Sequence, residues 1–197
     1  MQDDVIYREA LSQFRELLEA AQRTDLREPT AMTLATADRD GRPSVRTMLL
    51  KGVDERGFVF FTNSISRKGD ELQDNPRAAL CFFWQPLMRQ VRIEGRVKQV
   101  GAAGSDEYWT TRSRDSQLGA WASNQSQILD THQTLEQRVS EFHDRFLDQP
   151  VPRPSHWLGY RVIPERIEFW RSGWHRLHER ILYERQGDSW KRCLLYP

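Results

Sequence analysis

The segment Met88-Arg89-Gln90-Val91-Arg92-Ile93-Glu94-Gly95-Arg96-Val97-Lys98-Gln99-Val100 alternates between apolar and polar side chains. Val91, Ile93 and Val97 share one face of an extended chain, whereas the charged and amide side chains between them share the other. A period of two residues is typical of a β-strand with one buried and one solvated face. We therefore predict a long strand here, and with it a sheet that covers a hydrophobic core on one side.

Short segments rich in β-branched, aromatic and aliphatic residues lie on both sides of this strand. Turn sequences separate several of them, and Asp38-Arg39-Asp40-Gly41 and Asp54-Glu55-Arg56-Gly57 are typical of hairpin connections. Gln186-Gly187-Asp188 predicts a last hairpin. The segments predicted as strands are residues 31–37, 45–51, 57–63, 78–84, 157–170, 176–184 and 190–195.

Helical spacing of apolar residues predicts a helix over residues 4–22, which Asp3 or Asp4 could cap. Further helices are expected at 66–75, at 102–121 with a break near Ser113, and at 130–147. Hairpin-linked strands with helices set apart from them predict an α+β fold built on an antiparallel barrel. We expect one domain over residues 1–197, with an N-terminal helix and linker at 1–28 and C-terminal strands at 166–197.

The composition argues against several classes of protein. Hydrophobic residues make up 38% of the 197 residues and aromatic residues 11%, which suits a packed core rather than a disordered chain. A net charge of +1, from 29 basic and 28 acidic residues, argues against binding nucleic acid through bulk positive charge. Cys81 and Cys193 have no zinc-site spacing, and no apolar run reaches the roughly 20 residues of a membrane helix. The start has no signal-peptide pattern, so we expect a cytoplasmic protein without a metal site.

Basic residues at two places predict anion binding. Ser66-Arg67-Lys68 opens a predicted helix, where two adjacent cations oppose the helix dipole unless an anion binds. A solvated turn is the alternative. Arg46 and Lys51 lie in an otherwise apolar strand segment, on opposite faces if the strand is regular. Exposed charges on an edge strand would also account for that pair.

A third group lies on the predicted helix over residues 102–121. Tyr108, Arg112 and Ser116 are spaced by four residues, which places a phenol, a guanidinium and a hydroxyl on one helix face. Together these groups can donate hydrogen bonds to phosphate oxygens. An ordinary polar stripe on a surface helix is the alternative.

A fourth group lies near the C-terminus. Arg176, His178 and Arg180 alternate along a predicted strand and would form a cationic strip on one face, unless Glu168 or Glu179 neutralises it. The sequence contains no Ser-His-Asp order, no HExxH motif and no nucleophile elbow. The chemistry is therefore expected to come from a bound cofactor rather than from a protein nucleophile.

Taken together, these stretches resemble the pyridoxine (pyridoxamine) 5′-phosphate oxidase family. The resemblance covers the chain from about Pro29 to the C-terminus, and it rests on the order and spacing of the motifs. The matching stretches are Arg46-Thr47-Met48-Leu49-Leu50-Lys51, Phe60-Phe61-Thr62-Asn63, Ser66-Arg67-Lys68, Arg89-Gln90-Val91, Arg114-Asp115-Ser116-Gln117-Leu118-Gly119-Ala120-Trp121, Ser123-Asn124-Gln125-Ser126, Glu168-Phe169-Trp170 and Arg176-Leu177-His178-Glu179-Arg180.

The resemblance implies a split β-barrel homodimer with FMN at the subunit interface. It implies oxidation of pyridoxine 5′-phosphate or pyridoxamine 5′-phosphate to pyridoxal 5′-phosphate, with O₂ reduced to H₂O₂. Carried over residue by residue, the implied FMN-binding residues are Arg46, Thr47, Met48, Leu49, Leu50, Lys51, Phe61, Thr62, Arg67, Lys68, Gln90, Gln125, Ser126, Trp170 and Arg180. The implied substrate-binding residues are Lys51, Tyr108, Arg112, Ser116, Arg176, Leu177 and His178, and the implied catalytic residues are Arg176 and His178.

The chain departs from this pattern at three places. The acidic start stands where family members often carry a longer basic arm, and Phe61 stands where a tyrosine is common. The final Leu194-Leu195-Tyr196-Pro197 replaces the Arg-Leu-x-Pro ending that is frequent in the family, which removes an arginine contact.

Three other functions remain as alternatives. An FMN oxidase of phenazine biosynthesis resembles the chain around residues 27–44 and 176–180, but we expect that group to lack the counterparts of Lys51 and of the full set Tyr108, Arg112 and Ser116. A non-catalytic flavin-binding or storage module would need no second phosphate site. A barrel that binds nucleic acid is disfavoured by the near-zero net charge, and no membrane partner is expected.

Overall fold

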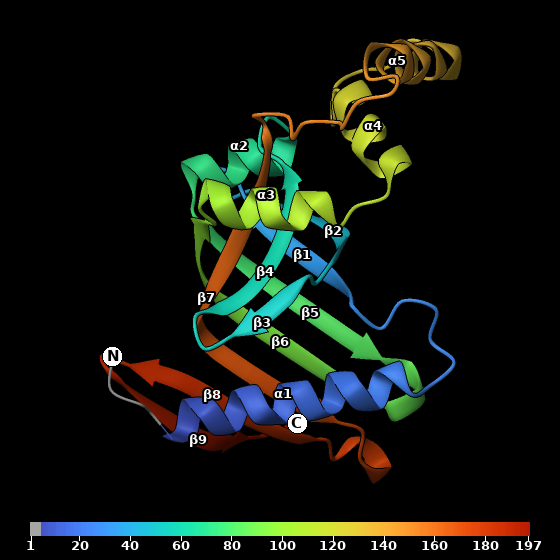
Figure 1. Ribbon diagram of the computed structural model, residues 1–197. Coiled ribbons are helices and arrows are strands. Elements are labelled where there is room, and N and C mark those ends of the chain that lie inside the picture. Colours follow the sequence, from blue (N-terminus) through green and yellow to red (C-terminus); the bar gives the residue numbers. More distant parts are fainter. Residues whose placement is uncertain (1–4) are drawn as a thin grey trace.

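The computed structural model describes residues 5–197, so the predicted cap at Asp3 or Asp4 lies outside the described residues. Within them, nine strands form one sheet with the order β2-β1-β5-β6-β7-β4-β3, in which β8 pairs with β7 and β9 pairs with β8. The sheet curls strongly (Figure 1). The strands are β1 (Ala31–Ala37), β2 (Pro43–Leu49), β3 (Gly52–Asp54), β4 (Gly57–Asn63), β5 (Arg77–Trp84), β6 (Arg89–Gln99), β7 (Trp157–Arg171), β8 (Glu179–Gln186) and β9 (Ser189–Leu195).

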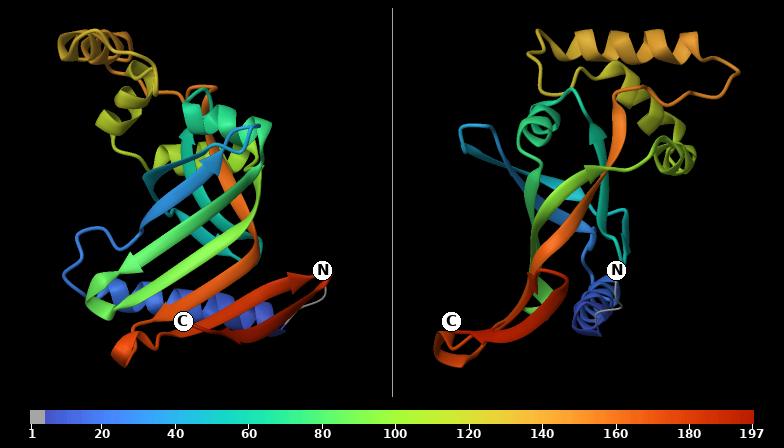
Figure 2. Two further views of the ribbon diagram at one scale, coloured as in Figure 1. Left: turned by 180° about the vertical axis from the view of Figure 1, so that it is seen from behind. Right: turned by 90° about the vertical axis from the view of Figure 1, so that its left-hand side faces the viewer.

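Helices cover the two ends of the sheet and extend beyond it. The long helix α1 lies beside the β8–β9 hairpin at one end, α2 and α3 lie at the other end, and α4 and α5 project beyond them (Figures 1 and 2). The helices are α1 (Val5–Gln22), α2 (Arg67–Asp74), α3 (Ala102–Thr110), α4 (Arg114–Ala122) and α5 (His132–Arg145). Every strand pairing is antiparallel, which confirms the expected α+β class.

The main core lies between α1 and the concave side of the sheet. The alternation expected for β6 is present, because Val91 and Ile93 are fully buried while the residues between them reach solvent. From α1, Phe14 inserts against the sheet and meets Phe58 and Phe82 edge to face at 4.9 and 5.1 Å. Burial of such aromatic groups is the main contribution that fixes α1 on the sheet.

Strand β7 connects the two ends of the molecule. Its first half pairs with β4 and its second half pairs with β8 along the same edge, while β6 pairs with it along the opposite edge. The register shifts at Glu94/Gly95, opposite Pro164. A Cβ at Gly95 would lie 2.0 Å from the carbonyl oxygen of Ile163, so this bulge requires glycine.

Three sequence predictions differ from the structure. The strand expected at 176–184 begins only at Glu179, because His175 and Arg176 have φ of 53° and 65° and form a 3₁₀ turn. The helix expected at 102–121 is two helices that end at Thr110 and restart at Arg114, so the predicted break is confirmed but the single helix is not. The short strand β3 was not expected.

Candidate functional site

The first turn of α2 carries a buried lysine. Lys68 is 7% exposed, and its ammonium donates to Ser66 Oγ at 3.1 Å and to Gln125 Oε1 at 2.6 Å. Burial, aided by the charge of Arg46 and opposed by that of Glu71, lowers the pKa of Lys68 to about 8. Within residues 5–197 this lysine makes no ion pair. A buried cation without a carboxylate partner at a helix N-terminus suits an anionic ligand.

Glu71, one turn further along α2, joins two predicted FMN-binding cations. Arg46 Nη2 donates to it at 3.1 Å and Arg67 Nε at 2.9 Å, while Ser44 and Thr36 add hydroxyl donors. Burial alone would raise the pKa of the Glu71 carboxyl, but these hydrogen bonds lower it to about 2. Arg46 therefore lies on an edge strand, β2, but its charge is paired with that of Glu71 and is not simply exposed to solvent.

The loop after α4 closes over the same turn of α2. Gln125 accepts from Lys68, and it lies 3.4 Å from the Thr62 hydroxyl of β4. Ser126 adopts a φ of 72°. A cavity of about 390 Å³ is lined by Arg67, Gln125 and Ser126 together with Glu71. Five residues that the resemblance assigns to FMN, from β4, from α2 and from the loop after α4, thus meet at this end of the molecule.

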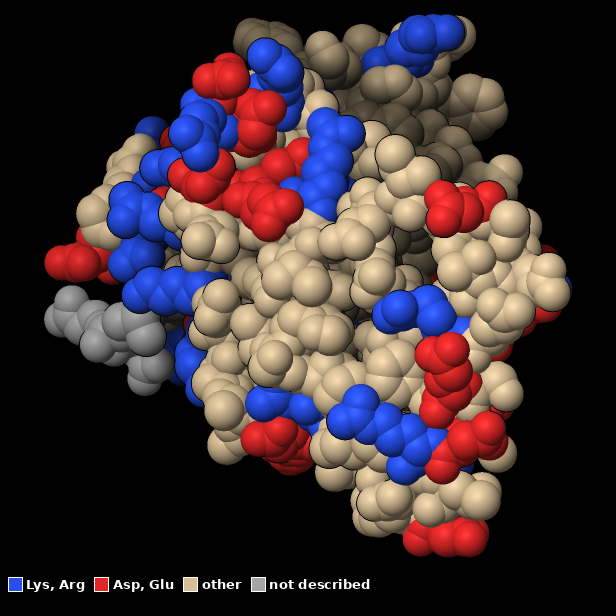
Figure 3. Space-filling view, turned by 90° about the horizontal axis from the view of Figure 1, so that it is seen from above, with Lys and Arg blue, Asp and Glu red and all other residues tan. Residues whose placement is uncertain are grey.

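Charges of both signs surround this end. Acidic and basic side chains are interspersed on the face seen from above, and they form no single basic patch (Figure 3). Asp74, which also lines the cavity, pairs with Arg39 at 3.1 Å, and Asp38 accepts from the backbone N–H groups of Asp40 and Arg42. The cations of α2 are therefore a local feature rather than part of a general positive surface.

A stack of aromatic rings lies between β4, α3 and β7. The rings of Phe61 and Tyr108 are parallel with centroids 4.2 Å apart, and Phe61 and Trp157 stack at 5.0 Å. The Arg112 guanidinium lies 4.9 Å from the Trp157 ring and donates to the Ser116 carbonyl at 2.9 Å. Its Nε is buried without a hydrogen-bond partner, and burial lowers the pKa of Arg112.

This arrangement corrects the predicted helix face. Tyr108 lies in the last turn of α3, Arg112 lies in the connection and Ser116 belongs to α4, so the three residues do not share one helix. They remain neighbours because Arg112 bridges to the backbone of Ser116. Within the described residues only Nη2 of this guanidinium has an acceptor, so terminal N–H groups of Arg112 remain for a ligand.

A second set of predicted residues forms a row across three strands. Gln90 on β6 lies opposite Trp170 on β7, and Trp170 lies opposite Arg180 on β8. Glu168, which is 7% exposed, accepts from Arg180 Nε at 2.8 Å and Nη2 at 3.0 Å. The ion pair that the sequence left as an alternative for Arg180 is therefore present.

The predicted catalytic pair lies beside this row. The His178 ring packs on Trp170 with centroids 4.7 Å apart, and its Nδ1 accepts from the Gly173 N–H at 3.3 Å. Arg176 lies in the turn before β8, and Leu177 is 72% exposed. The expected alternation of Arg176, His178 and Arg180 along one strand is wrong, because only Arg180 belongs to β8.

The two sets lie at opposite ends of β7. The α2 set adjoins the start of this strand, where Asn63 pairs with Trp157, whereas Trp170 is 13 residues further on. At about 3.3 Å per residue, this corresponds to roughly 40 Å of strand. The remaining predicted residues belong to the edge strand β2 and the residues after it: Thr47, Met48 and Leu49 lie in β2, followed by buried Leu50 and exposed Lys51.

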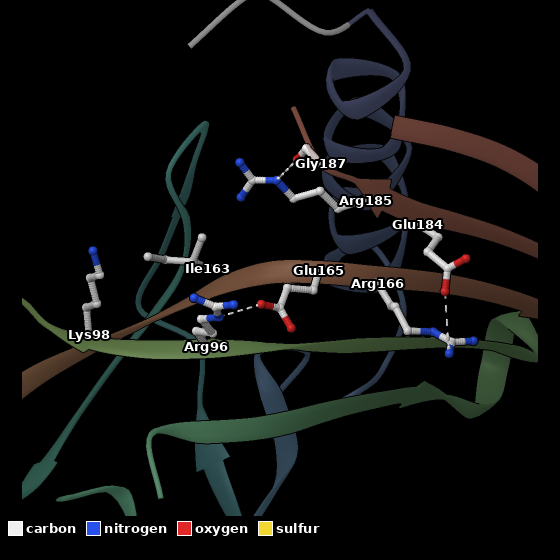
Figure 4. Close-up of a pocket in the computed structure, with 8 residues that line it drawn as sticks. All are labelled: Arg96, Lys98, Ile163, Glu165, Arg166, Glu184, Arg185 and Gly187. Carbon is white, nitrogen blue, oxygen red and sulfur yellow. Dashed lines mark hydrogen bonds and ion pairs between the residues drawn. The ribbon is translucent and has the colours of Figure 1, made fainter. Parts of the chain in front are cut away.

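One other cavity, of about 610 Å³, contains none of the predicted residues. It lies between β6, β7 and the β8–β9 hairpin, where Arg96 pairs with Glu165 and Arg166 with Glu184 (Figure 4). Within the described residues there is no cluster of three or more potential metal ligands. No helix among residues 5–197 is long and apolar enough to span a membrane.

Sequence reasoning missed Glu71 and the aromatic stack. Arg67 and Glu71 are four residues apart on a helix, which is a signal for an ion pair. The contacts of Glu71 with Thr36 and Ser44, and those of Phe61 with Tyr108 and Trp157, join residues that are far apart in the chain. Local sequence patterns do not predict such contacts.

Comparison with known proteins assigns the chain to a family. Residues 18–146 match the family model described as pyridoxamine 5′-phosphate oxidase, and residues 157–197 match the model described as pyridoxine 5′-phosphate oxidase C-terminal dimerisation region. The chain is 53% identical over 187 residues to a Myxococcus xanthus protein named pyridoxine/pyridoxamine 5′-phosphate oxidase, which covers 95% of this chain and 91% of that protein.

Two further comparisons agree. A protein of the same name from Alkalilimnicola ehrlichii is 54% identical over 191 residues, covering 96% of this chain and 97% of that protein. Among solved structures, PhzG from Burkholderia lata 383, in complex with tetrahydrophenazine-1-carboxylic acid, superposes with a TM-score of 0.90 at 35% identity, covering 95% of this chain and 92% of that chain. The sheet topology and this likeness confirm the expected α+β split-barrel fold with flanking helices.

Proposed function

Because the chain belongs to the pyridoxamine 5′-phosphate oxidase family, we propose that it binds FMN and oxidises pyridoxine 5′-phosphate or pyridoxamine 5′-phosphate to pyridoxal 5′-phosphate. The enzyme is an oxidase by family. Bound FMN would accept a hydride from the substrate and pass its electrons to O₂, which yields H₂O₂. The observation that carries the proposal is the presence of two separate cation sets with unused donors, on the ammonium of Lys68 and on the terminal nitrogens of Arg112.

The α2 end fits the phosphate of FMN. Lys68 offers a buried ammonium without a carboxylate partner, and Arg67, whose terminal nitrogens have no acceptor within the described residues, lines the cavity together with Gln125 and Ser126. Free N–H groups of the first turn of α2 add to this positive end. These residues would bind the phosphate and fix the orientation of the cofactor.

The second set would bind the flavin from another subunit. Gln90, Trp170 and Arg180 lie too far along β7 from Lys68 to contact one cofactor together with it. A homodimer in which the α2 end of one protomer meets the Trp170 end of its partner would complete the site. The match of residues 157–197 to a dimerisation region supports this arrangement. FMN would then lie at the subunit interface.

Arg112 fits the phosphate of the substrate. Among residues 5–197 only its Nη2 has an acceptor, and the stack of Trp157, Phe61 and Tyr108 holds the guanidinium in place. The hydroxyls of Tyr108 and Ser116 and the ammonium of Lys51 would add donors. A phosphate held there would orient the substrate, and orientation of this kind contributes several kcal/mol to catalysis.

Arg176 and His178 would hold the reacting end of the substrate. The His178 ring is fixed by its contact with Trp170 and by the Gly173 N–H, which leaves Nε2 free to face a ligand. Arg176, in its exposed turn, would supply the positive charge next to the substrate.

The test is oxygen uptake by purified protein. A yellow protein that consumes O₂ and forms the aldehyde with either phosphorylated vitamer supports the proposal. Bound flavin with no turnover of either vitamer would contradict it and favour a flavin-binding module. Since the solved structure of PhzG is also similar, tetrahydrophenazine-1-carboxylic acid belongs in the same assay, and turnover of that compound alone would favour the phenazine alternative.

A further inference from the structure

Glu71 is a charged residue inside the proposed phosphate site to which the family resemblance gives no role. It is 5% exposed, and four side chains donate to its two carboxylate oxygens. Two of these donors are the hydroxyls of Thr36 and Ser44, and the other two are the guanidinium groups of Arg46 and Arg67. A negative charge next to an anion site needs a physical reason.

The two arginines use opposite ends of their guanidinium groups. The terminal nitrogens of Arg46 donate to Leu34 O at 3.3 Å, Thr36 Oγ1 at 2.5 Å, Ser44 Oγ at 2.6 Å and Glu71 Oε2 at 3.1 Å. These four contacts use all four terminal N–H donors, so only the Nε–H of Arg46 remains for a ligand.

Arg67 is held in the reverse way. Its Nε donates to Glu71 Oε1 at 2.9 Å, and within residues 5–197 its terminal nitrogens have no acceptor. Its side chain is 65% exposed and lines the cavity with Gln125 and Ser126. The free end is the fork that binds phosphate oxygens in pairs.

We propose that Glu71 is a positioning residue for phosphate recognition: it holds Arg67 by Nε so that the terminal fork faces the flavin phosphate, with Arg46 as its counter-ion. The charges agree with this role. Arg46, Arg67 and Lys68 with Glu71 carry two net positive charges, which match a phosphate monoester near neutral pH. The inference rests on the proposed use of FMN.

The competing interpretation is purely structural. Through Thr36 and Ser44, Glu71 ties α2 to the β1–β2 hairpin, and this tie could be its whole purpose. A structural tie would affect riboflavin and FMN equally, because the two ligands differ only by the phosphate. The ratio of their dissociation constants therefore separates the two interpretations.

The experiment compares FMN and riboflavin binding by flavin fluorescence for wild type and Glu71→Gln. We expect FMN affinity to fall about tenfold or more, the value of one lost charge-assisted hydrogen bond, while riboflavin affinity changes less than about twofold. Removal of a negative charge alone would tighten FMN binding, so weakening identifies positioning. Unchanged or tighter FMN binding, or equal losses for both ligands, would overturn the proposal.

Asp74→Asn is the matched control. It removes the same charge from the same helix and the same cavity, but Asp74 pairs with Arg39 rather than with Arg46 or Arg67. We expect the ratio of its dissociation constants for FMN and riboflavin to stay within about threefold of the wild-type ratio, because an exposed ion pair contributes little energy. A loss as large as that of Glu71→Gln would mean that any carboxylate on α2 suffices, and would overturn the proposal.

Arg67→Lys keeps the experiment decisive if Glu71→Gln does not fold. Arg67 is exposed, and lysine keeps the charge but cannot both bind Glu71 and present a fork. A selective loss of FMN affinity supports positioning, and full affinity overturns it. Wild-type protein that does not prefer FMN over riboflavin would instead contradict the proposed function itself.

Discussion

The ammonium of Lys68 donates to the side-chain oxygen of Gln125 over 2.6 Å and so joins the first turn of α2 to the loop after α4. The two residues are 57 positions apart in the chain. Ser66-Arg67-Lys68 and the stretch from Ser123 to Ser126, which are separate motifs in the sequence, therefore form one site. Because the acceptor is a neutral amide and not a carboxylate, the positive charge of Lys68 is not neutralised by this contact and remains available for a ligand.

FMN binding should weaken above about pH 8. Burial and the nearby Arg46 lower the pKa of Lys68 to about 8, with Glu71 acting in the opposite sense. A bound phosphate dianion favours the charged ammonium, so the pKa rises in the complex and binding above pH 8 takes up a proton. Calorimetry should give a dissociation constant that rises toward tenfold per pH unit there. In Lys68→Arg, whose guanidinium stays charged, the same pH range should give a flat profile; a flat wild-type profile would contradict the role of Lys68.

Arg112→Ala should raise the substrate KM by about tenfold to a hundredfold, with FMN affinity nearly unchanged. The substitution removes a charge-assisted donor from the proposed substrate-phosphate site, which corresponds to roughly 1.5–3 kcal/mol. Steady-state kinetics with both vitamers give the KM values, and a flavin titration gives the dissociation constant of FMN. Arg145→Ala is the control, because Arg145 also lies over an aromatic ring, that of Trp121, but outside the predicted site. Equal losses of FMN and substrate binding in Arg112→Ala would argue against the assignment.

Local patterns in the sequence were enough to predict most of the strands. The alternation of Val91, Ile93 and Val97 predicts β6 because one face of that strand is buried and the other is solvated, and the burial pattern follows this alternation. The turn signals around Gly41 and Gly57 agree with positive φ values of 81° and 124° at these glycines. Information of this kind is local and therefore visible in one sequence.

The remaining features depend on contacts between distant segments. Nothing local indicates that His175 and Arg176 leave the extended conformation, because a positive φ is uncommon for any residue other than glycine. The stack of Phe61 on Tyr108 joins residues from two separate elements, and the role of Glu71 depends on the β1–β2 hairpin folding over α2. The resemblance to a family indicated which residues belong to the site, but it did not indicate that one chain places them at two ends of β7.

Glu168→Gln should lower the free energy of unfolding by about 1–2 kcal/mol. Glu168 is buried and binds Arg180 through both carboxylate oxygens, with Arg92 at 3.3 Å as a second partner. The amide keeps the shape but loses the charge-assisted bonds, while the partly exposed Arg180 remains solvated. Urea unfolding should show a lower midpoint at an unchanged slope. Glu94→Gln removes only the more exposed ion pair with Arg92 and should change the free energy of unfolding by less than about 0.5 kcal/mol. Equal changes for the two variants would contradict a larger stabilising role for Glu168.

Gly95→Ala should destabilise the protein by about 1–3 kcal/mol, because an added Cβ would lie 2.0 Å from the carbonyl oxygen of Ile163 and 3.0 Å from Pro164 Cα. Both neighbours are backbone atoms of β7, so neither can rotate away, and the strand would have to shift where it passes from β4 to β8. Gly119→Ala is the control, since that glycine lies in α4 with nothing within 4 Å of an added Cβ. Alanine there should stabilise the helix by up to about 1 kcal/mol. The midpoints of thermal unfolding of the two variants should therefore shift in opposite directions. An unchanged midpoint for Gly95→Ala would mean that the bulge tolerates a side chain. The path of β7 would then not depend on this close approach.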